Sequence, residues 1–140
     1  MKTKWDALIK KYDVAYQEEL KALLWSVREI EKAYENKATL EEQEADSWRK
    51  LSNREYLSSG DLAFDGEFRS SVAKLKANLD YAIAELKDDE AELKSRVARC
   101  ARLLKKYEFL RDRDLLEYAN ARELDEADDL EDWVMNARTE

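Results

Sequence analysis

The side chains that carry most catalytic and metal chemistry are scarce in this chain. Its 140 residues include no histidine and one cysteine, beside 33 aspartates and glutamates. Without histidine, the commonest general base and metal ligand are missing, and a single thiol cannot build a zinc site. Carboxylates on charged helices are usually solvated. We therefore expect no catalytic residues, no metal site, no cofactor and no enzyme activity.

The composition instead favours long helices. Charged residues make up 41% of the chain, and there are only two glycines and no proline, so few residues could interrupt a helix. The hydrophobic content of 44%, with four tryptophans and seven tyrosines, provides enough apolar surface for folding. An all-α fold class follows.

A first apolar stripe with spacings of three and four residues predicts a helix over residues 3–56. Thr3 and Asp6 match an N-terminal cap, in which a side-chain oxygen accepts a bond from an early amide. The stripe fades near Asn36, where a break is the alternative, because Thr39 and Glu42 could form a second cap. The predicted core residues of this helix are Trp5, Ile9, Tyr12, Tyr16, Leu20, Leu23, Val27, Ile30 and Tyr34.

Both glycines fall within residues 57–66, which we predict to be a bend. A second stripe then predicts a helix over residues 67–117. Its core residues are Phe68, Val72, Leu75, Leu79, Leu86, Leu93, Val97, Cys100, Leu104 and Tyr107. Two narrow stripes joined by a short bend indicate an antiparallel coiled-coil hairpin, as a monomer or a coiled-coil dimer. We expect one elongated domain over residues 1–140, with residues 118–140 overhanging the hairpin as a helical extension.

The net charge is concentrated in this extension. Residues 1–111 hold 22 basic and 22 acidic residues, whereas residues 112–140 hold three arginines and 11 acidic residues. A balanced body argues against nucleic-acid binding, and we expect the basic residues between Lys94 and Lys106 to pair with Glu18 and Glu19 across the hairpin. The acidic extension, ending near Trp133 and Val134, is predicted to be amphipathic and to bind a partner protein. The alternative is a third short helix folded back on the hairpin.

The compartment is also predicted. The lone Cys100 cannot form an internal disulfide, which favours a reducing environment. The first residues lack the apolar segment of a signal peptide, and the longest apolar runs are too short to span a bilayer. We expect a cytoplasmic protein without membrane insertion.

Two segments carry a family resemblance. Leu103-Leu104-Lys105-Lys106-Tyr107-Glu108-Phe109-Leu110-Arg111-Asp112-Arg113 and Asn120-Ala121-Arg122-Glu123-Leu124-Asp125-Glu126 combine leucines, basic residues and a late Asp-Glu pair. This pattern resembles the stalk proteins of type III export, the flagellar FliJ and virulence-system YscO family. The resemblance implies a coiled-coil shaft that binds the export ATPase, promotes its assembly or activity and links it to the export gate. Residues 57–64 would then be the distal end, and the ATPase end would contain Leu110, Arg111, Arg113, Leu116, Arg122, Asp125 and Glu126.

Two other functions fit the same residues. One is a coiled-coil adaptor or secretion chaperone that binds a partner through its acidic C-terminal helix. The other is an acidic inhibitor that imitates nucleic acid, in which case its binding should depend steeply on salt.

Overall fold

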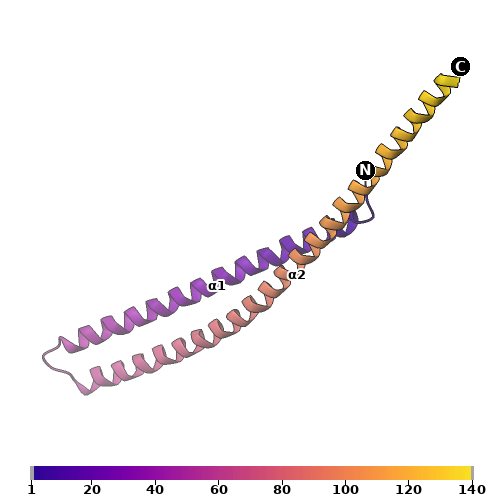
Figure 1. The fold of residues 1–140 in the computed structure, drawn as a ribbon. Coiled ribbons are helices and arrows are strands. Elements are labelled where there is room, and N and C mark those ends of the chain that lie inside the picture. The colour runs from indigo at the N-terminus through magenta and orange to yellow at the C-terminus, as the bar shows by residue number, and fades with distance from the viewer. Residues whose placement is uncertain (1, 140) are drawn as a thin grey trace. The chain divides into compact units, whose positions relative to one another are not determined.

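The computed structural model describes residues 2–139, and all of its regular structure is helical. Helix α1 spans Asp6–Ser52 and helix α2 spans Ser59–Thr139 (Figure 1), with no strand among the described residues. The all-α fold class and the two long packed helices are therefore confirmed. Met1 and Glu140, the ends of the predicted single domain, lie outside the described residues, and that domain stays a prediction.

The chain divides into two compact units. The inner unit is Glu19–Arg96, and the terminal unit combines Met1–Glu18 with Val97–Glu140. In the inner unit, Lys37 forms an ion pair with Asp80 at 2.7 Å and Glu44 with Lys76 at 3.0 Å. Arg54 and Asp61 form a third pair at 2.9 Å, close to the linker. Partner numbers fall along α2 as they rise along α1, so the helices of this unit run in opposite directions.

The core of the inner unit is thin. Its fully buried residues are Ser26, Ile30 and Ala33 of α1 together with Val72 and Ile83 of α2. Serine and alanine are small and let two helix backbones approach closely. A contact between only two helices buries a single row of residues on each, which accounts for the short list.

Most of the predicted stripe residues lie on this contact or on the corresponding contact of the terminal unit. Ile30 and Val72 are buried. The partly buried members are Trp5, Ile9, Tyr12, Tyr16, Leu20, Leu23, Val27, Phe68, Leu79, Leu86, Leu93, Val97, Cys100, Leu104 and Tyr107.

Two predicted core residues are wrong, because Tyr34 is 44% exposed and Leu75 is 50% exposed. Both sit at the edge of the row, where no third helix covers them. The Tyr34 ring is instead covered by the Lys87 ammonium at 5.3 Å. Ile83, which is buried, was absent from the predicted core.

The start of α1 confirms the predicted cap. The Thr3 backbone N–H donates to Asp6 Oδ2 at 2.7 Å, and the Trp5 N–H donates to Thr3 Oγ1 at 3.3 Å. The helix is continuous past Asn36, so the alternative of a break is wrong. The Thr39 hydroxyl donates to the Glu35 carbonyl at 3.0 Å, a bond within the helix that leaves no free cap at this position.

The predicted bend at residues 57–66 is wrong, since the linker is residues 53–58 and both glycines lie inside α2. No described glycine has a positive φ. The helix begins early because Ser58 and Asp61 form a reciprocal cap. The Asp61 N–H donates to Ser58 Oγ at 3.0 Å, and the Ser58 N–H donates to Asp61 Oδ2 at 3.2 Å. Residues 118–139, predicted to be a helical extension, continue α2 without a break to Thr139, because no glycine or proline follows Gly66.

We predict that Ser58→Ala lowers the free energy of unfolding by about 1 kcal/mol, because the Asp61 amide loses its acceptor. Urea denaturation followed by circular dichroism measures the change. Ser59→Ala is the matched control, since the Ser59 side chain makes none of the capping bonds and should change stability by less than about 0.5 kcal/mol. Equal losses in the two variants would contradict the cap.

Ile83 and Leu75 provide a second comparison on α2. Ile83→Ala removes a side chain that is 5% exposed and should cost about 2 to 4 kcal/mol, because it leaves a cavity between the helices. Leu75→Ala removes a half-exposed side chain and should cost less than about 1.5 kcal/mol. Thermal unfolding measures both, and a larger loss for Leu75→Ala would show that the core row is misplaced.

Candidate functional site

An aromatic cluster fixes which side of α2 faces α1 in the terminal unit. The Tyr107 ring stacks on the Trp5 ring with centroids 5.7 Å apart, and on the Tyr12 ring at 5.4 Å. About two helical turns after Tyr107 on α2, Asp114 Oδ2 accepts a hydrogen bond from the Trp5 Nε1–H at 2.7 Å. Tyr107 and Asp114 therefore mark the α1-facing side of α2.

The Trp5–Asp114 hydrogen bond changes the acidity of the carboxyl group. The indole N–H stabilises the carboxylate and holds the pKa of Asp114 below its ordinary value, with a smaller contribution from Arg113. Partial burial of Asp114 acts in the opposite direction. The bond joins residues 109 positions apart in the sequence and lies where α1 begins.

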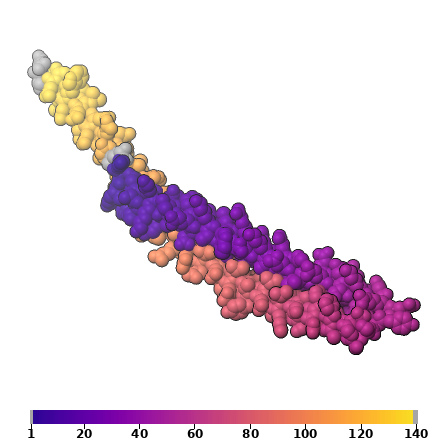
Figure 2. Space-filling model, turned by 180° about the vertical axis from the view of Figure 1, so that it is seen from behind, coloured from indigo at the N-terminus to yellow at the C-terminus, as the bar shows by residue number. Residues whose placement is uncertain are grey.

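Beyond this contact, α2 continues with no other described residue of the terminal unit beside it. Every residue from Leu116 to Arg138 is exposed, and Figure 2 shows the yellow segment extending past the indigo residues of this unit. We call residues 116–139 the tail. Its exposed large hydrophobic residues are Leu116, Tyr118, Leu124, Leu130, Trp133, Val134 and Met135. The alternative of a separate third helix folded back on the hairpin is wrong, because α2 runs unbroken to Thr139.

The tail has two chemically different sides. Eighteen residues make about five helical turns, so residues with this separation share a side. Tyr107, Arg111 and Asp114 on the α1-facing side are therefore followed by Asp125, Asp129 and Asp132. The opposite side carries Leu116, Ala127, Leu130 and Val134. The face that packs on α1 thus becomes acidic in the tail, and the apolar face lies on the other side.

The predicted partner-binding residues are spread around α2. Leu110 and Arg111 are partly buried, and the others are exposed: Arg113, Leu116, Arg122, Asp125, Glu126, Trp133 and Val134. The arginines are engaged locally, because Arg111 pairs with Asp112 at 3.1 Å, Arg113 with Asp114 at 3.3 Å and Arg122 with Glu126 at 3.5 Å. The apolar residues Leu116 and Val134 share one side of the helix, whereas Asp125 lies opposite.

The sequence prediction missed Phe109, which is 68% exposed and lies on the apolar side of α2 before the tail. Leu124 and Leu130, which are 66% and 62% exposed, belong to the predicted amphipathic extension but were not among the predicted binding residues. The signal that would have found Phe109 is its 18-residue separation from Ala127 on the same side of the helix.

The basic residues of α2 do not pair across the hairpin as predicted. Lys94 and Arg96 instead pair within α2, with Glu90 at 2.7 Å and Glu92 at 2.6 Å. Among the described residues, neither Glu18 nor Glu19 forms an ion pair. The reason is that Arg99, Arg102, Lys105 and Lys106 are exposed on turns whose α1-facing residues are Cys100 and Tyr107.

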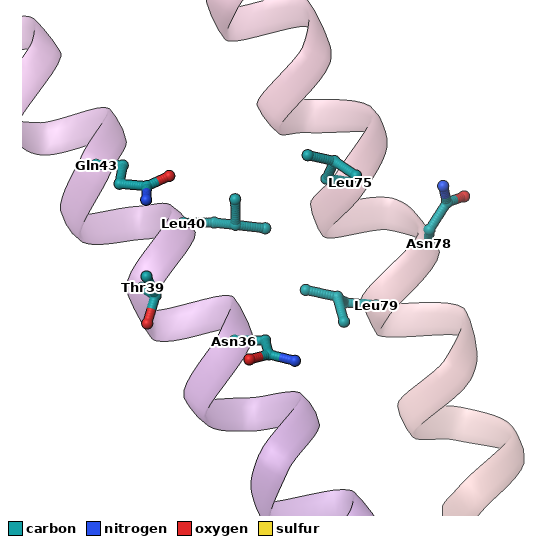
Figure 3. Close-up of a pocket in the computed structure, with 7 residues that line it drawn as sticks. All are labelled: Asn36, Thr39, Leu40, Gln43, Leu75, Asn78 and Leu79. Atoms are coloured by element: carbon teal, nitrogen blue, oxygen red, sulfur yellow. The ribbon is translucent and has the colours of Figure 1, made fainter.

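A groove of about 430 Å³ lies between the helices of the inner unit. Leu40 points from α1 toward Leu75 and Leu79 of α2 (Figure 3). The other residues that line the groove are Asn36, Thr39, Gln43 and Asn78. The groove has an apolar floor and neutral polar edges, and it explains the exposure of Leu75.

The described residues contain no group of three or more cysteine, aspartate or glutamate side chains arranged to hold a metal ion. Within the same residues, neither helix combines the length and the apolar character that a membrane span requires. Comparison of the chain with protein families, curated proteins and solved structures gives no match.

The lowered pKa of Asp114 leads to a pH-dependent prediction. A carboxyl group with a lowered folded-state pKa stabilises the fold above its unfolded pKa of about 3.9, and this stabilisation is lost as the pH falls through the folded-state value. Trp5→Phe keeps a ring on Tyr107 but removes the N–H donor. The pKa of Asp114 should then rise toward the ordinary value, as measured by NMR titration of its carboxyl carbon.

The same variant should melt at a lower temperature than the natural protein at pH 7. This difference should shrink as the pH falls below about 3.9, because the protonated carboxyl no longer gains from the bond. Tyr12→Phe is the control, since it keeps the stack and leaves Asp114 untouched. A melting difference for Trp5→Phe that is independent of pH would contradict the role of the hydrogen bond.

Proposed function

We propose that this protein is a non-enzymatic coiled-coil stalk of a type III secretion or flagellar export apparatus, located in the cytoplasm. In this role it binds the export ATPase through the C-terminal end of α2, promotes its assembly or activity and links it to the export gate. The observation that carries the proposal is the tail, an exposed helical segment with seven large hydrophobic residues that nothing in the terminal unit covers.

The two long helices support a shaft. In the inner unit they run in opposite directions and share a thin row of buried residues, which supports the proposed antiparallel coiled coil. A helix rises about 1.5 Å per residue, so the 34 residues of α1 in the inner unit, 19–52, extend for about 50 Å. Such a helix pair has little internal volume for a substrate and much lateral surface for protein contacts.

The chemistry of the tail defines the partner surface. Residues 116–138 carry eight acidic residues and two arginines beside the apolar side. An amphipathic helix of this kind fits an apolar groove with a basic rim, because apolar burial supplies affinity and the charges guide association. Residues 103–113 and 120–126 resemble the FliJ and YscO family, so we propose that this groove lies on the export ATPase.

A titration of the purified export ATPase from the same organism tests this proposal. We expect the full chain to raise steady-state ATP hydrolysis and the hexamer fraction, the latter measured by light scattering. A truncation after residue 117 keeps the Trp5–Asp114 bond and removes nearly all of the tail, so it should fold and fail to stimulate.

A pair of full-length variants refines the test. Leu130→Ser with Val134→Ser changes the apolar side of the tail and should lower the affinity for the ATPase at least tenfold. Asp129→Ser on the opposite side is the matched control and should bind within about threefold of the natural protein. Absence of binding by the full chain, or equal stimulation by the truncation, would contradict the stalk proposal.

The same tail supports a second candidate, a coiled-coil adaptor or secretion chaperone. That function predicts a one-to-one complex with a secreted protein and no effect on ATP hydrolysis. An acidic inhibitor that imitates nucleic acid is the third candidate, and its binding to a target would be displaced by DNA or RNA.

A further inference from the structure

The side of α2 that faces away from α1 is exposed along the whole terminal unit. Helical spacing places Ala98, Phe109, Leu116, Ala127 and Val134 in one line, which we call the outer face. All five are exposed, and Phe109 and Leu116 have 68% and 62% of their surface in contact with solvent. This face therefore starts well before the tail and passes through it without interruption.

Charge divides the outer face into two halves. Before Leu116 most of the charged residues beside it are basic: Arg99, Arg102, Lys105 and Lys106, against Glu108 and Asp112. After Leu116 most are acidic: Glu123, Glu126 and Glu131, against Arg138. The two sets lie at similar distances on either side of Leu116, since Arg102 and Glu131 are each about four turns away.

Most of these charges cannot be satisfied within their own helix. Ion pairs on a helix form between residues three or four positions apart. Arg102 has Arg99, Lys105 and Lys106 at those positions, and Glu131 has Asp128 and no basic residue. Within the described part of the chain, Arg99, Arg102, Lys105, Glu123 and Glu131 form no ion pair.

We propose that the outer face binds a second copy of this chain, antiparallel, with a two-fold axis near Leu116. In this arrangement the basic half of each copy lies against the acidic half of the other, and Leu116 meets its own equivalent. Arg99 and Arg102 of one copy face Glu131 of the other, Lys105 lies between Glu123 and Glu131, and Lys106 faces Glu126. Phe109 then lies between Asn120 and Ala127 of the other copy, level with Glu123.

The charge pattern of the outer face identifies a second copy of this chain as its partner, because the pattern matches itself after a two-fold rotation. A two-fold contact requires that each surface match itself after rotation, and a face with opposite charges on either side of one apolar residue meets that requirement. A parallel dimer would place like charges together and is disfavoured. The contact closes on itself, so it yields a dimer and no longer assembly.

This inference goes beyond the proposed function and does not rest on it. It has a consequence for that function, because the dimer covers Leu116, Ala127 and Val134, which belong to the proposed partner surface. Self-association would therefore prevent the tail from binding a partner protein until that partner displaces the second copy.

Sedimentation equilibrium of the full chain tests the dimer. We expect a dimer in 50 mM NaCl whose dissociation constant rises about tenfold or more in 500 mM NaCl, because salt screens exposed charge pairs. Arg102→Glu with Lys105→Glu should give a monomer in 50 mM NaCl, and so should Glu123→Lys with Glu131→Lys. An equimolar mixture of these two variants should form a heterodimer, since each supplies the charge that the other now needs.

Disulfide trapping tests the direction of the pairing. In a Cys100→Ser background, Leu116→Cys should cross-link to its own copy, because the residue lies near the two-fold axis. Leu130→Cys is the matched control and should not, since the two copies of this residue lie at opposite ends of the contact.

A monomeric chain at both salt concentrations, a mixture of variants that stays monomeric, or efficient cross-linking of Leu130→Cys would each overturn the proposal. These experiments read the mass and cross-linking of this chain alone. Their failure is therefore distinguishable from a failure of the stalk proposal, which is read from the ATPase.

Discussion

The apolar stripes of α1 and α2 have only each other to cover them, and this constraint shapes both units. With two helices, each can bury one narrow row, which in the inner unit comprises Ser26, Ile30, Ala33, Val72 and Ile83. Apolar residues beside that row remain exposed to solvent. The exposed Leu75 lines a groove, and Tyr34 is covered by a lysine. In the terminal unit the same constraint leaves the tail uncovered, because α1 begins beside Asp114.

The two long helices and their partly buried stripes could be predicted because both depend on regular spacing and on the scarcity of glycine and proline, but of the buried row only Ile30 and Val72 were among the predicted core residues. Composition placed the linker wrongly. Gly60 and Gly66 suggest a turn, but the Ser58–Asp61 cap starts α2 before them, so the linker is residues 53–58. Exposure at Leu75 depends on whether a third helix is present, which periodicity does not report. For the candidate site, the sequence indicated an acidic, amphipathic end, but it did not indicate that the exposed apolar side begins as early as Phe109.

The charges of this protein fall into two classes with different roles. In the inner unit, Lys37–Asp80 and Lys76–Glu44 join one helix to the other and help to set their alignment. On the outer face of α2, Arg99, Arg102 and Glu131 have no opposite charge three or four positions away. Charges of the first kind serve the fold. Those of the second kind remain available to another chain. The equal numbers of acidic and basic residues in 1–111 therefore do not show which charges are free to bind a partner.

The separation of paired residues along the sequence sets the order in which the fold closes. Lys76 and Glu44 are 32 positions apart, whereas Trp5 and Asp114 are 109 apart. Closing a longer loop costs more chain entropy, so we expect contacts next to the linker to form before those of the aromatic cluster. During synthesis, the stripe of α1 emerges before the part of α2 that contacts it. The hydrogen bond of Trp5 can form only after residue 114 has been made.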